Sequence, residues 1–389
     1  MSLEHYYQTF LQNNPYPREL KNYAFDDHAS SIYLNYNGKK LINFSSSDYL
    51  GLAKHPLLLA RSHQYAQKLG TGSTASRLVS GNFPQYDVLE KKIAAAMGKA
   101  SALILAAGYQ ANTSILEALF DPAILTAKPL VFCDRLCHAS LLATTRFLAE
   151  LKRFQHNDLS HLAELLEKYK HDTRPKFILV ESIYSMDGDQ VDFAKLVPLA
   201  KQHHAFLYVD DAHAVGVYGE YGQGKAAAYA ADIDIIMGTF SKALGSFGAY
   251  VACSHTLRDY LINKCKGLIY STGPSPAVLG AMDAALELIP AMHAERQRVA
   301  GYAARFRQRL DKHHLNYGHS DTHIVPWIIG DAEETIRMSL LLQEQGILGT
   351  TIRPPSVPVG KSRIRFCLSA AHSEEDMAQL FYAIENIIK

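Results

Sequence analysis

The stretch from residue 84 to about residue 285 alternates short apolar runs with longer segments of helical periodicity. Continuous apolar runs of this length are typical of parallel strands that are buried on both faces. The pattern predicts strands at 102–106, 130–134, 177–181, 206–210, 233–237 and 248–253, and helices at 86–97, 110–119, 139–149, 158–169 and 193–202. Because strands and helices alternate, we expect an α/β fold with a mainly parallel central sheet covered by helices.

The two ends of the chain have a different pattern. An amphipathic helix near the start is followed by a polar connection, a short strand at 41–44 and a helix at 57–69. A long helical region from about 276 to 314 precedes a smaller α+β segment, with strands at 323–329, 350–353 and 363–368 and helices at 332–345 and 373–388. We therefore expect an N-terminal arm (1–45), a large domain (46–285) and a small C-terminal α+β domain (286–389).

Composition excludes several classes of partner. The 389 residues carry 39 basic and 38 acidic side chains, so the net charge of +1 gives no reason to expect nucleic acid or an anionic membrane as a partner. The apolar runs are too short to span a membrane, and the N-terminus has no apolar secretory segment. Five cysteines, an odd number, favour a reducing compartment. We expect a cytoplasmic protein.

A lysine follows one of the predicted buried strands. Lys242 comes shortly after the strand at 233–237, in the run TFSKALG. Burial of an ammonium group is costly and lowers its pKa, which makes a nucleophilic amine available for Schiff-base chemistry. A serine–lysine pair alone is far more typical of an ordinary surface lysine, so the residues that follow the other strands are needed to distinguish the two interpretations.

Polar residues also follow the neighbouring strands, at the sheet edge where ligands of such folds collect. Asp210 could pair with a protonated pyridine nitrogen, and His213 could bind a phenolic oxygen. His138 offers a ring for stacking, and Gly108–Tyr109 can begin a helix that holds a phosphate. Taken singly, each histidine could be structural and Asp210 could cap a helix. Taken together with Lys242, they indicate a pyridoxal-phosphate pocket.

Two other motifs have residue types found in metal and nucleotide sites. Cys133, Cys137 and His138 lie close in sequence, but no second Cys/His pair stands at ligand spacing, so we expect no metal site. The glycine-rich run at 70–82 does not follow a strand, so it fails the dinucleotide pattern. We expect it to be a packed loop beside an active site.

Five motifs resemble the α-oxoamine synthases, a branch of the fold-type I pyridoxal-phosphate enzymes. They are NFSSSDYLGL (43–52), DRLCHASL (134–141), SMDGD (185–189), VDDAHAVGVYGEYGQG (209–224) and GTFSKALG (238–245). The resemblance extends from about residue 15 to the end of the chain. Within the family, TIRPPSVPVGKSRIR (351–365) is similar to the members that make 8-amino-7-oxononanoate for biotin synthesis.

The resemblance implies a reaction. We expect a pyridoxal-phosphate-dependent acyltransferase that condenses L-alanine with a pimeloyl thioester, carried by coenzyme A or an acyl carrier protein, and releases carbon dioxide. A homodimer with a shared active site is implied as well. Two alternatives stay open: an α-oxoamine synthase that uses a longer neutral acyl thioester to make an α-aminoketone signal, and a non-catalytic regulator that binds the cofactor.

The resemblance also implies residue roles. Lys242 matches the lysine that forms the cofactor imine and takes the Cα proton, Asp210 the partner of the ring nitrogen, and His138 the stacked ring. The remaining cofactor contacts are Ser185 and His213 near the phenolic oxygen, Gly108, Tyr109 and Thr239 at the phosphate, and Ser271 and Thr272 reaching the phosphate of the neighbouring subunit. The implied substrate contacts are Arg18, Ser47, His138, Ser356 and Arg365.

Two positions depart from the family pattern. Ser47 stands where the family commonly has an asparagine that helps to hold the amino-acid carboxylate. Serine is shorter and offers one hydroxyl, so we expect a longer or water-mediated contact. Tyr86 stands where a histidine is expected, with little consequence for the chemistry.

Overall fold

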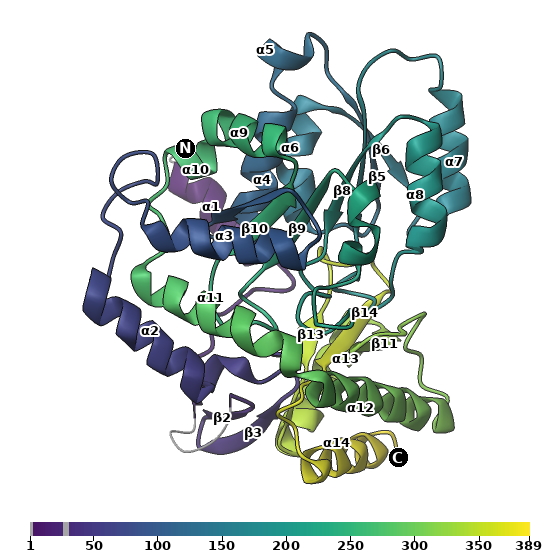
Figure 1. Ribbon diagram of the computed structural model, residues 1–389. Helices are drawn as coiled ribbons and strands as arrows, with labels where there is room; N and C mark the ends of the chain where they lie inside the picture. The colour runs from purple at the N-terminus through teal and green to yellow at the C-terminus, as the bar shows by residue number, and fades with distance from the viewer. Residues whose placement is uncertain (1–2, 26–30) are drawn as a thin grey trace.

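A seven-stranded sheet forms the centre of the molecule (Figure 1). The computed structural model describes residues 3–25 and 31–389. In spatial order the strands are β4 (Ser101–Leu105), β10 (Ala249–Cys253), β9 (Ile235–Thr239), β8 (Phe206–Asp210), β7 (Lys176–Glu181), β5 (Leu130–Asp134) and β6 (Glu150–Phe154). Strand β10 runs opposite to the other six strands of this sheet, so the predicted mainly parallel sheet is confirmed.

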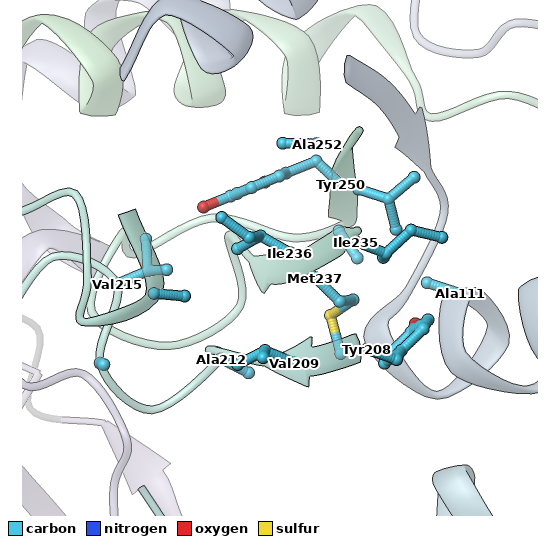
Figure 2. Close-up of a cluster of buried hydrophobic side chains, with 14 of the residues drawn as sticks. Ala111, Tyr208, Val209, Ala212, Val215, Ile235, Ile236, Met237, Tyr250 and Ala252 are labelled. Atoms are coloured by element: carbon cyan, nitrogen blue, oxygen red, sulfur yellow. The ribbon is translucent and has the colours of Figure 1, made fainter. Parts of the chain in front are cut away.

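The central strands are buried along their whole length, as their continuous apolar runs predicted. Every residue of β4, β5, β9 and β10 is buried. Figure 2 shows Val209 of β8, Ile235 and Ile236 of β9 and Tyr250 of β10 in one hydrophobic cluster. Tyr250 packs so closely over Gly238 that a Cβ atom there would lie 2.3 Å from its ring, so this strand position requires glycine.

Helices lie on both sides of this sheet (Figure 1). They are α2 (Pro56–Leu69), α3 (Pro84–Ala96), α4 (Gly108–Leu119), α5 (Pro122–Leu125), α6 (Ala139–Leu148), α7 (Leu159–Lys168), α8 (Phe193–Gln202), α9 (His255–Lys264), α10 (Lys266–Ile269) and α11 (Pro276–Leu288). Helix α11 packs along α2, and α4 contacts both α6 and β9. The helices predicted at 86–97, 110–119, 139–149, 158–169 and 193–202 are all present, with bounds shifted by at most two residues.

The C-terminal part forms a second core. Strands β11 (Ile324–Gly330), β14 (Ser362–Cys367) and β13 (Thr350–Ile352) make an antiparallel sheet with α12 (His293–Lys312), α13 (Ala332–Glu344) and α14 (Glu374–Ile387) around it. Phe306, Phe366 and Leu380 are buried in its core, together with Ile42 and Phe44 from the N-terminal part. The two ends of the chain therefore share one hydrophobic cluster.

The N-terminal strands explain why the two ends of the chain share one hydrophobic cluster. After α1 (Leu3–Asn13), strands β1 (Ala24–Phe25), β2 (Tyr33–Tyr36) and β3 (Lys39–Asn43) join β12 (Ile347–Leu348) in a four-stranded sheet. Strand β3 pairs in parallel with β12, which follows α13. Strands β2 and β3 are thus anchored on the C-terminal segment. Helix α1 itself has no buried residue in this chain.

The long helical region predicted after residue 276 is divided. Helix α11 is followed by the short 3-10 helix Ile289–Ala291, and α12 continues at an angle of 76°. Within the described ranges no single helix has the length and apolar composition of a membrane span. Residues 276–291 and 293–312 meet both criteria only when the two helices are taken together as one bent pair.

Candidate active site

A cavity of about 380 Å³ lies at the carboxyl edge of the large sheet. Because all strands of that sheet except β10 point the same way, the residues that follow them meet at this edge. The cavity brings together ten of the predicted site residues: Ser47, Gly108, Tyr109, His138, Ser185, Asp210, His213, Thr239, Lys242 and Arg365.

Lys242 follows β9 and reaches the cavity as the sequence predicted. Burial lowers the pKa of its ammonium group, while the nearby carboxyl groups of Asp210 and Glu181 act in the opposite direction. The net result is a lowered pKa, so a larger fraction of Lys242 is neutral amine than in an exposed lysine. A lysine in this state can act as a nucleophile or a proton acceptor.

Asp210 is the last residue of β8, and two donors fix its buried carboxylate. The backbone N–H of Ala212 donates to Oδ1 at 3.0 Å, and Asn112 Nδ2 of α4 donates to Oδ2 at 2.8 Å. Tyr208 in turn donates to Asn112 Oδ1 at 2.7 Å, which sets the orientation of the amide. A carboxylate has about four acceptor positions, so Asp210 can still bind a protonated ring nitrogen.

His138 lies at the start of α6, where its ring caps the helix. The ring Nδ1 is 2.7 Å from Ser140 Oγ, and the backbone N–H of His138 donates to Glu181 Oε1. Burial lowers the pKa of the imidazole, so the ring is neutral near pH 7. Asn112 also donates to Ser140 Oγ at 2.9 Å, so one amide ties the Asp210 carboxylate to the His138 ring.

His213 and Arg365 line the cavity from different elements, the loop after β8 and strand β14. The Tyr49 hydroxyl and His213 Nδ1 lie 2.7 Å apart, and burial, reinforced by Lys242 and Arg365, lowers the pKa of His213 well below its usual value. Arg365 of β14 donates from Nη1 to the carbonyl of Ser185 at 3.1 Å. Its Nε is buried and has no partner among the described residues. A guanidinium with unused donors beside a cavity is suited to a carboxylate.

The N-terminus of α4 supplies an anion site at the same cavity. Gly108 is the first residue of α4, and no side chain in the described part of the chain caps this end of the helix. Thr239 Oγ1, which donates to the Gly248 carbonyl at 2.9 Å, lies next to Gly108. Unpaired N–H groups at a helix start bind phosphate readily.

A buried ion cluster supports the loops that carry His138 and Ser185. His156 Nδ1 lies 3.0 Å from Asp134 Oδ1 and its Nε2 lies 2.8 Å from Asp189 Oδ2. Burial alone would lower the pKa of His156, but the hydrogen bonds and charges of the two aspartates raise it to about 10. The ring is therefore a cation that holds together the end of β5 and the loop after β7.

These groups fit pyridoxal phosphate. The lysine with a lowered pKa, the anchored carboxylate of Asp210, the uncapped start of α4 and the neutral ring of His138 lie around one cavity. They match the aldehyde, the ring nitrogen, the phosphate and the ring face of the cofactor, respectively.

Four predicted residues do not line this cavity in the single chain. Arg18 and Ser356 border a separate depression of about 580 Å³, which we call the outer hollow; it is also lined by Lys21, α13 residues and Arg353. Arg18 Nη2 donates to Ser356 Oγ at 3.3 Å. Ser271 and Thr272 lie elsewhere, where Thr272 forms a β-bridge with Ser76 of the glycine-rich loop.

The glycine-rich loop has two buried residues, Ser73 and Gly81, and does not line the cavity in this chain. Ser73 Oγ donates to the Pro274 carbonyl at 2.6 Å, and Arg77 pairs with buried Glu90 at 2.5 Å. That this loop lies beside an active site stays a prediction. The buried hydroxyl of Tyr86 donates to the same Pro274 carbonyl at 3.0 Å, a structural role for the position where histidine was expected.

Three residues of the site were not singled out from the sequence. Asn112 lies in a largely apolar helix. A single amide at a core-facing position of such a helix was the signal that could have identified it. Glu181 is the last residue of a largely apolar strand, as Asp210 is. Tyr49 gave no separate signal, because its contact with His213 depends on residues 164 positions apart.

Known proteins resemble this chain in sequence and in structure. A family model described as "Aminotransferase class I and II" matches residues 39–384. An 8-amino-7-oxononanoate synthase of Gluconacetobacter diazotrophicus is 46% identical over 92% of this chain and 91% of its own length. A Magnetococcus marinus protein with the same name, given as provisional, is 49% identical over 91% of this chain and 90% of its own length.

Two solved structures have the same fold. Serine palmitoyltransferase of Sphingomonas wittichii matches with a TM-score of 0.88 and 26% identity, over 99% of this chain and 95% of that one. An 8-amino-7-oxononanoate synthase of Francisella tularensis matches with a TM-score of 0.76 and 25% identity, over 90% of this chain and 98% of that one. The predicted fold-type I architecture is thereby confirmed. The chain belongs to the class I and II aminotransferase family and, within its pyridoxal-phosphate-dependent acyltransferases, to the α-oxoamine synthases.

Proposed function

We propose that the protein condenses L-alanine with a pimeloyl thioester to give 8-amino-7-oxononanoate. A bond forms between the alanine Cα and the thioester carbonyl carbon while the carbon–sulfur bond breaks and the carrier thiol leaves. The former alanine carboxylate is lost as carbon dioxide, and a proton takes its place at Cα. The observation that carries the proposal is the shared cavity of Lys242, Asp210 and Arg365 in a chain 46% identical to a named 8-amino-7-oxononanoate synthase.

Lys242 and Asp210 have complementary parts in this reaction. Bound pyridoxal phosphate supplies a conjugated, protonated ring that accepts the electron pair left at Cα. Asp210 would pair with the ring nitrogen of the bound cofactor, and its two hydrogen bonds hold the carboxylate in place. The neutral fraction of the Lys242 amine takes the Cα proton and returns a proton later. Positioned acid–base catalysis of this kind contributes about 10²–10⁴-fold.

Other residues position the substrate and the cofactor. Arg365, with its unused Nε donor, and Ser47, which lines the same cavity, are suited to the alanine carboxylate. The start of α4 and Thr239 would hold the phosphate, and His138 would stack on the ring. Ser185 and His213 would bind the phenolic oxygen.

The acyl substrate would approach from the outer hollow. Arg18 is exposed there and lies within hydrogen-bond distance of Ser356, so its charge is available for the distal carboxylate of a pimeloyl group. Arg353 fixes the segment that carries Arg18, because it donates to the carbonyls of Tyr16 and Pro17 at 3.0 and 3.1 Å.

We further propose that two copies of the chain share their active sites. Ser271 and Thr272 lie outside the cavity lining of their own chain, and Thr272 is exposed. This placement agrees with a role at the phosphate of a second copy. Sedimentation at working concentration tests it: a dimer is expected, and a fully active monomer would refute a shared site.

A second candidate has a specific observation in its favour. Serine palmitoyltransferase, a protein named for a long acyl chain, matches this fold with the higher TM-score of the two structures, 0.88 against 0.76. An α-oxoamine synthase with a long neutral acyl donor is therefore the alternative. The sequence identities, 46–49% to the named oxononanoate synthases against 26% to this enzyme, favour the first proposal.

The decisive experiment is an acyl-donor panel with alanine held constant. Pimeloyl, octanoyl and decanoyl thioesters are supplied on coenzyme A and on acyl carrier protein, and free thiol and the amino-ketone product are measured. We expect the largest kcat/KM with a pimeloyl donor. A preference for decanoyl would establish the alternative, and no thiol release with any donor would refute both.

A further inference from the structure

Glu181 is a second buried carboxyl group at the active site that the proposed reaction has not used. It is the last residue of β7 and lines the cavity. In the parallel register of β7 and β8, Glu181 lies directly opposite Asp210. Neighbouring residues on parallel strands point to the same face, so the two carboxyl groups share one small region of low dielectric constant.

The two carboxyl groups have unequal surroundings. Among the described residues, the Asp210 carboxylate accepts hydrogen bonds from the Asn112 amide and the Ala212 N–H, whereas Glu181 accepts one, from the His138 N–H. Two adjacent carboxylates in a buried site cannot both ionise without a large cost, and the one with more donors retains the charge.

Two negatively charged neighbours of Glu181 also favour its neutral form. Asp210 faces it from β8 and Asp134 from the end of β5, and both oppose a further negative charge. Lys242 and the His138 N–H favour the ionised form but are outweighed. Burial, the largest influence, and then Asp210 raise the pKa of Glu181 well above its usual range.

We propose that Glu181 is a positioning residue that works as a neutral carboxylic acid: it holds the His138 backbone in place and leaves Asp210 as the single anion facing the cofactor ring. A protonated carboxyl group retains the carbonyl oxygen that accepts the His138 N–H bond. An ionised Glu181 would add a second negative charge beside Asp210 and compete for Lys242. The catalytic part of this inference rests on the proposed function; the protonation state does not.

The test of the protonation state is the stability of full-length holoprotein against pH, for the wild type and Glu181→Gln. A glutamine keeps the carbonyl and cannot ionise. In the unfolded chain Glu181 ionises near its ordinary pKa of 4.5, whereas the folded protein keeps it neutral. The wild type should therefore lose stability relative to the variant as pH rises, by about tenfold in the unfolding equilibrium constant per pH unit. If the unfolding equilibrium constant of the wild type divided by that of Glu181→Gln stays constant or falls between pH 6 and 8, the proposal is overturned.

The positioning role of Glu181 is tested by comparing kcat/KM of Glu181 variants with that of the matched amide substitution at Asp210. Glu181→Gln should lower kcat/KM for alanine by a few-fold, whereas Glu181→Ala should lower it at least tenfold more because the His138 N–H loses its acceptor. Asp210→Asn, the matched amide substitution, should cost far more than Glu181→Gln. Equal losses for Glu181→Gln and Asp210→Asn would contradict a neutral Glu181. If no acyl donor gives product, the stability measurement still decides the protonation state.

Discussion

The cavity and the outer hollow are built in different ways. The cavity is formed by residues that follow buried strands of one sheet, and hydrogen bonds such as those of Asn112 fix its carboxylate. The outer hollow lies between the N-terminal segment, α13 and the residues after β13, and its main cation, Arg18, is exposed. In the proposed reaction, chemistry takes place at the buried end of the central sheet and acyl recognition at an exposed, peripheral depression.

This difference has a consequence for the effect of mutations. Changes in the cavity should act on turnover or on the stability of the whole domain, since Glu181, Asp210 and Thr239 are buried at the ends of sheet strands. Changes in the outer hollow should act on the affinity for the acyl donor and leave the alanine step intact. Each substitution below tests one side of that division.

The largest effect is expected for Lys242→Ala. Loss of the amine removes the base for the Cα proton, so exchange of that proton with deuterated water, measured by NMR with alanine alone, should fall by at least about 10³-fold. Lys195→Ala is the matched control, since that lysine is exposed and pairs with Asp192 at 3.2 Å. Exchange that persists in Lys242→Ala at the wild-type rate would remove Lys242 from the mechanism.

His156→Gln should reduce stability by about 3–5 kcal/mol at pH 6, because it leaves Asp134 and Asp189 buried without a cation. The pKa of His156 is raised to about 10 in the folded protein, so its contribution is complete below pH 6.5 and is lost as pH rises through 10. Denaturant unfolding at several pH values should show the two proteins converging at high pH. A difference that grows with pH would contradict a protonated His156.

Arg18→Ala should raise KM for a pimeloyl thioester roughly tenfold or more while kcat and alanine proton exchange change little, because a hydrogen-bonded charge is lost from the acyl end only. Lys21→Ala is the control within the same outer hollow. With an octanoyl donor, Arg18→Ala should have no such effect. A fall in kcat without a change in KM would show that the outer hollow is not a separate acyl site.

The smallest effect is expected for Arg353→Gln. It removes the two hydrogen bonds to the carbonyls of Tyr16 and Pro17 and the stacking on Tyr16, at 5.1 Å from the ring centroid. Arg18 would then be held less firmly, and KM for the acyl donor should rise on the order of threefold. If Arg353→Gln acts as strongly on octanoyl as on pimeloyl donors, it does not act through Arg18.

The sequence predicted the buried sheet well because its strands are continuous apolar runs. The bounds of β5 and β8 agree with the prediction, and β9 begins two residues later than expected. Strand β6 was missed: its sequence ELKRF is an edge strand with one buried residue, so no apolar run marks it.

The residues of the site show the same difference between local patterns and long-range contacts. Residues that follow apolar strands, such as Asp210 and Lys242, could be found from local patterns, and the resemblance assigned their roles. The pairing of β3 with β12 and the contact of Tyr49 with His213 join segments far apart in the chain, and no local pattern encodes them. Contacts that involve a second copy of the chain, as proposed for Thr272, lie beyond any description of one chain.

The most direct test of the account is chemical labelling of the holoprotein. Sodium borohydride fixes pyridoxal phosphate on the amine to which it is bound, and peptide mass spectrometry then locates the adduct. We predict a single adduct on Lys242, where the lowered pKa and the facing Asp210 place the reactive amine. A protein that takes up no cofactor, or an adduct on another lysine, would contradict the central claim.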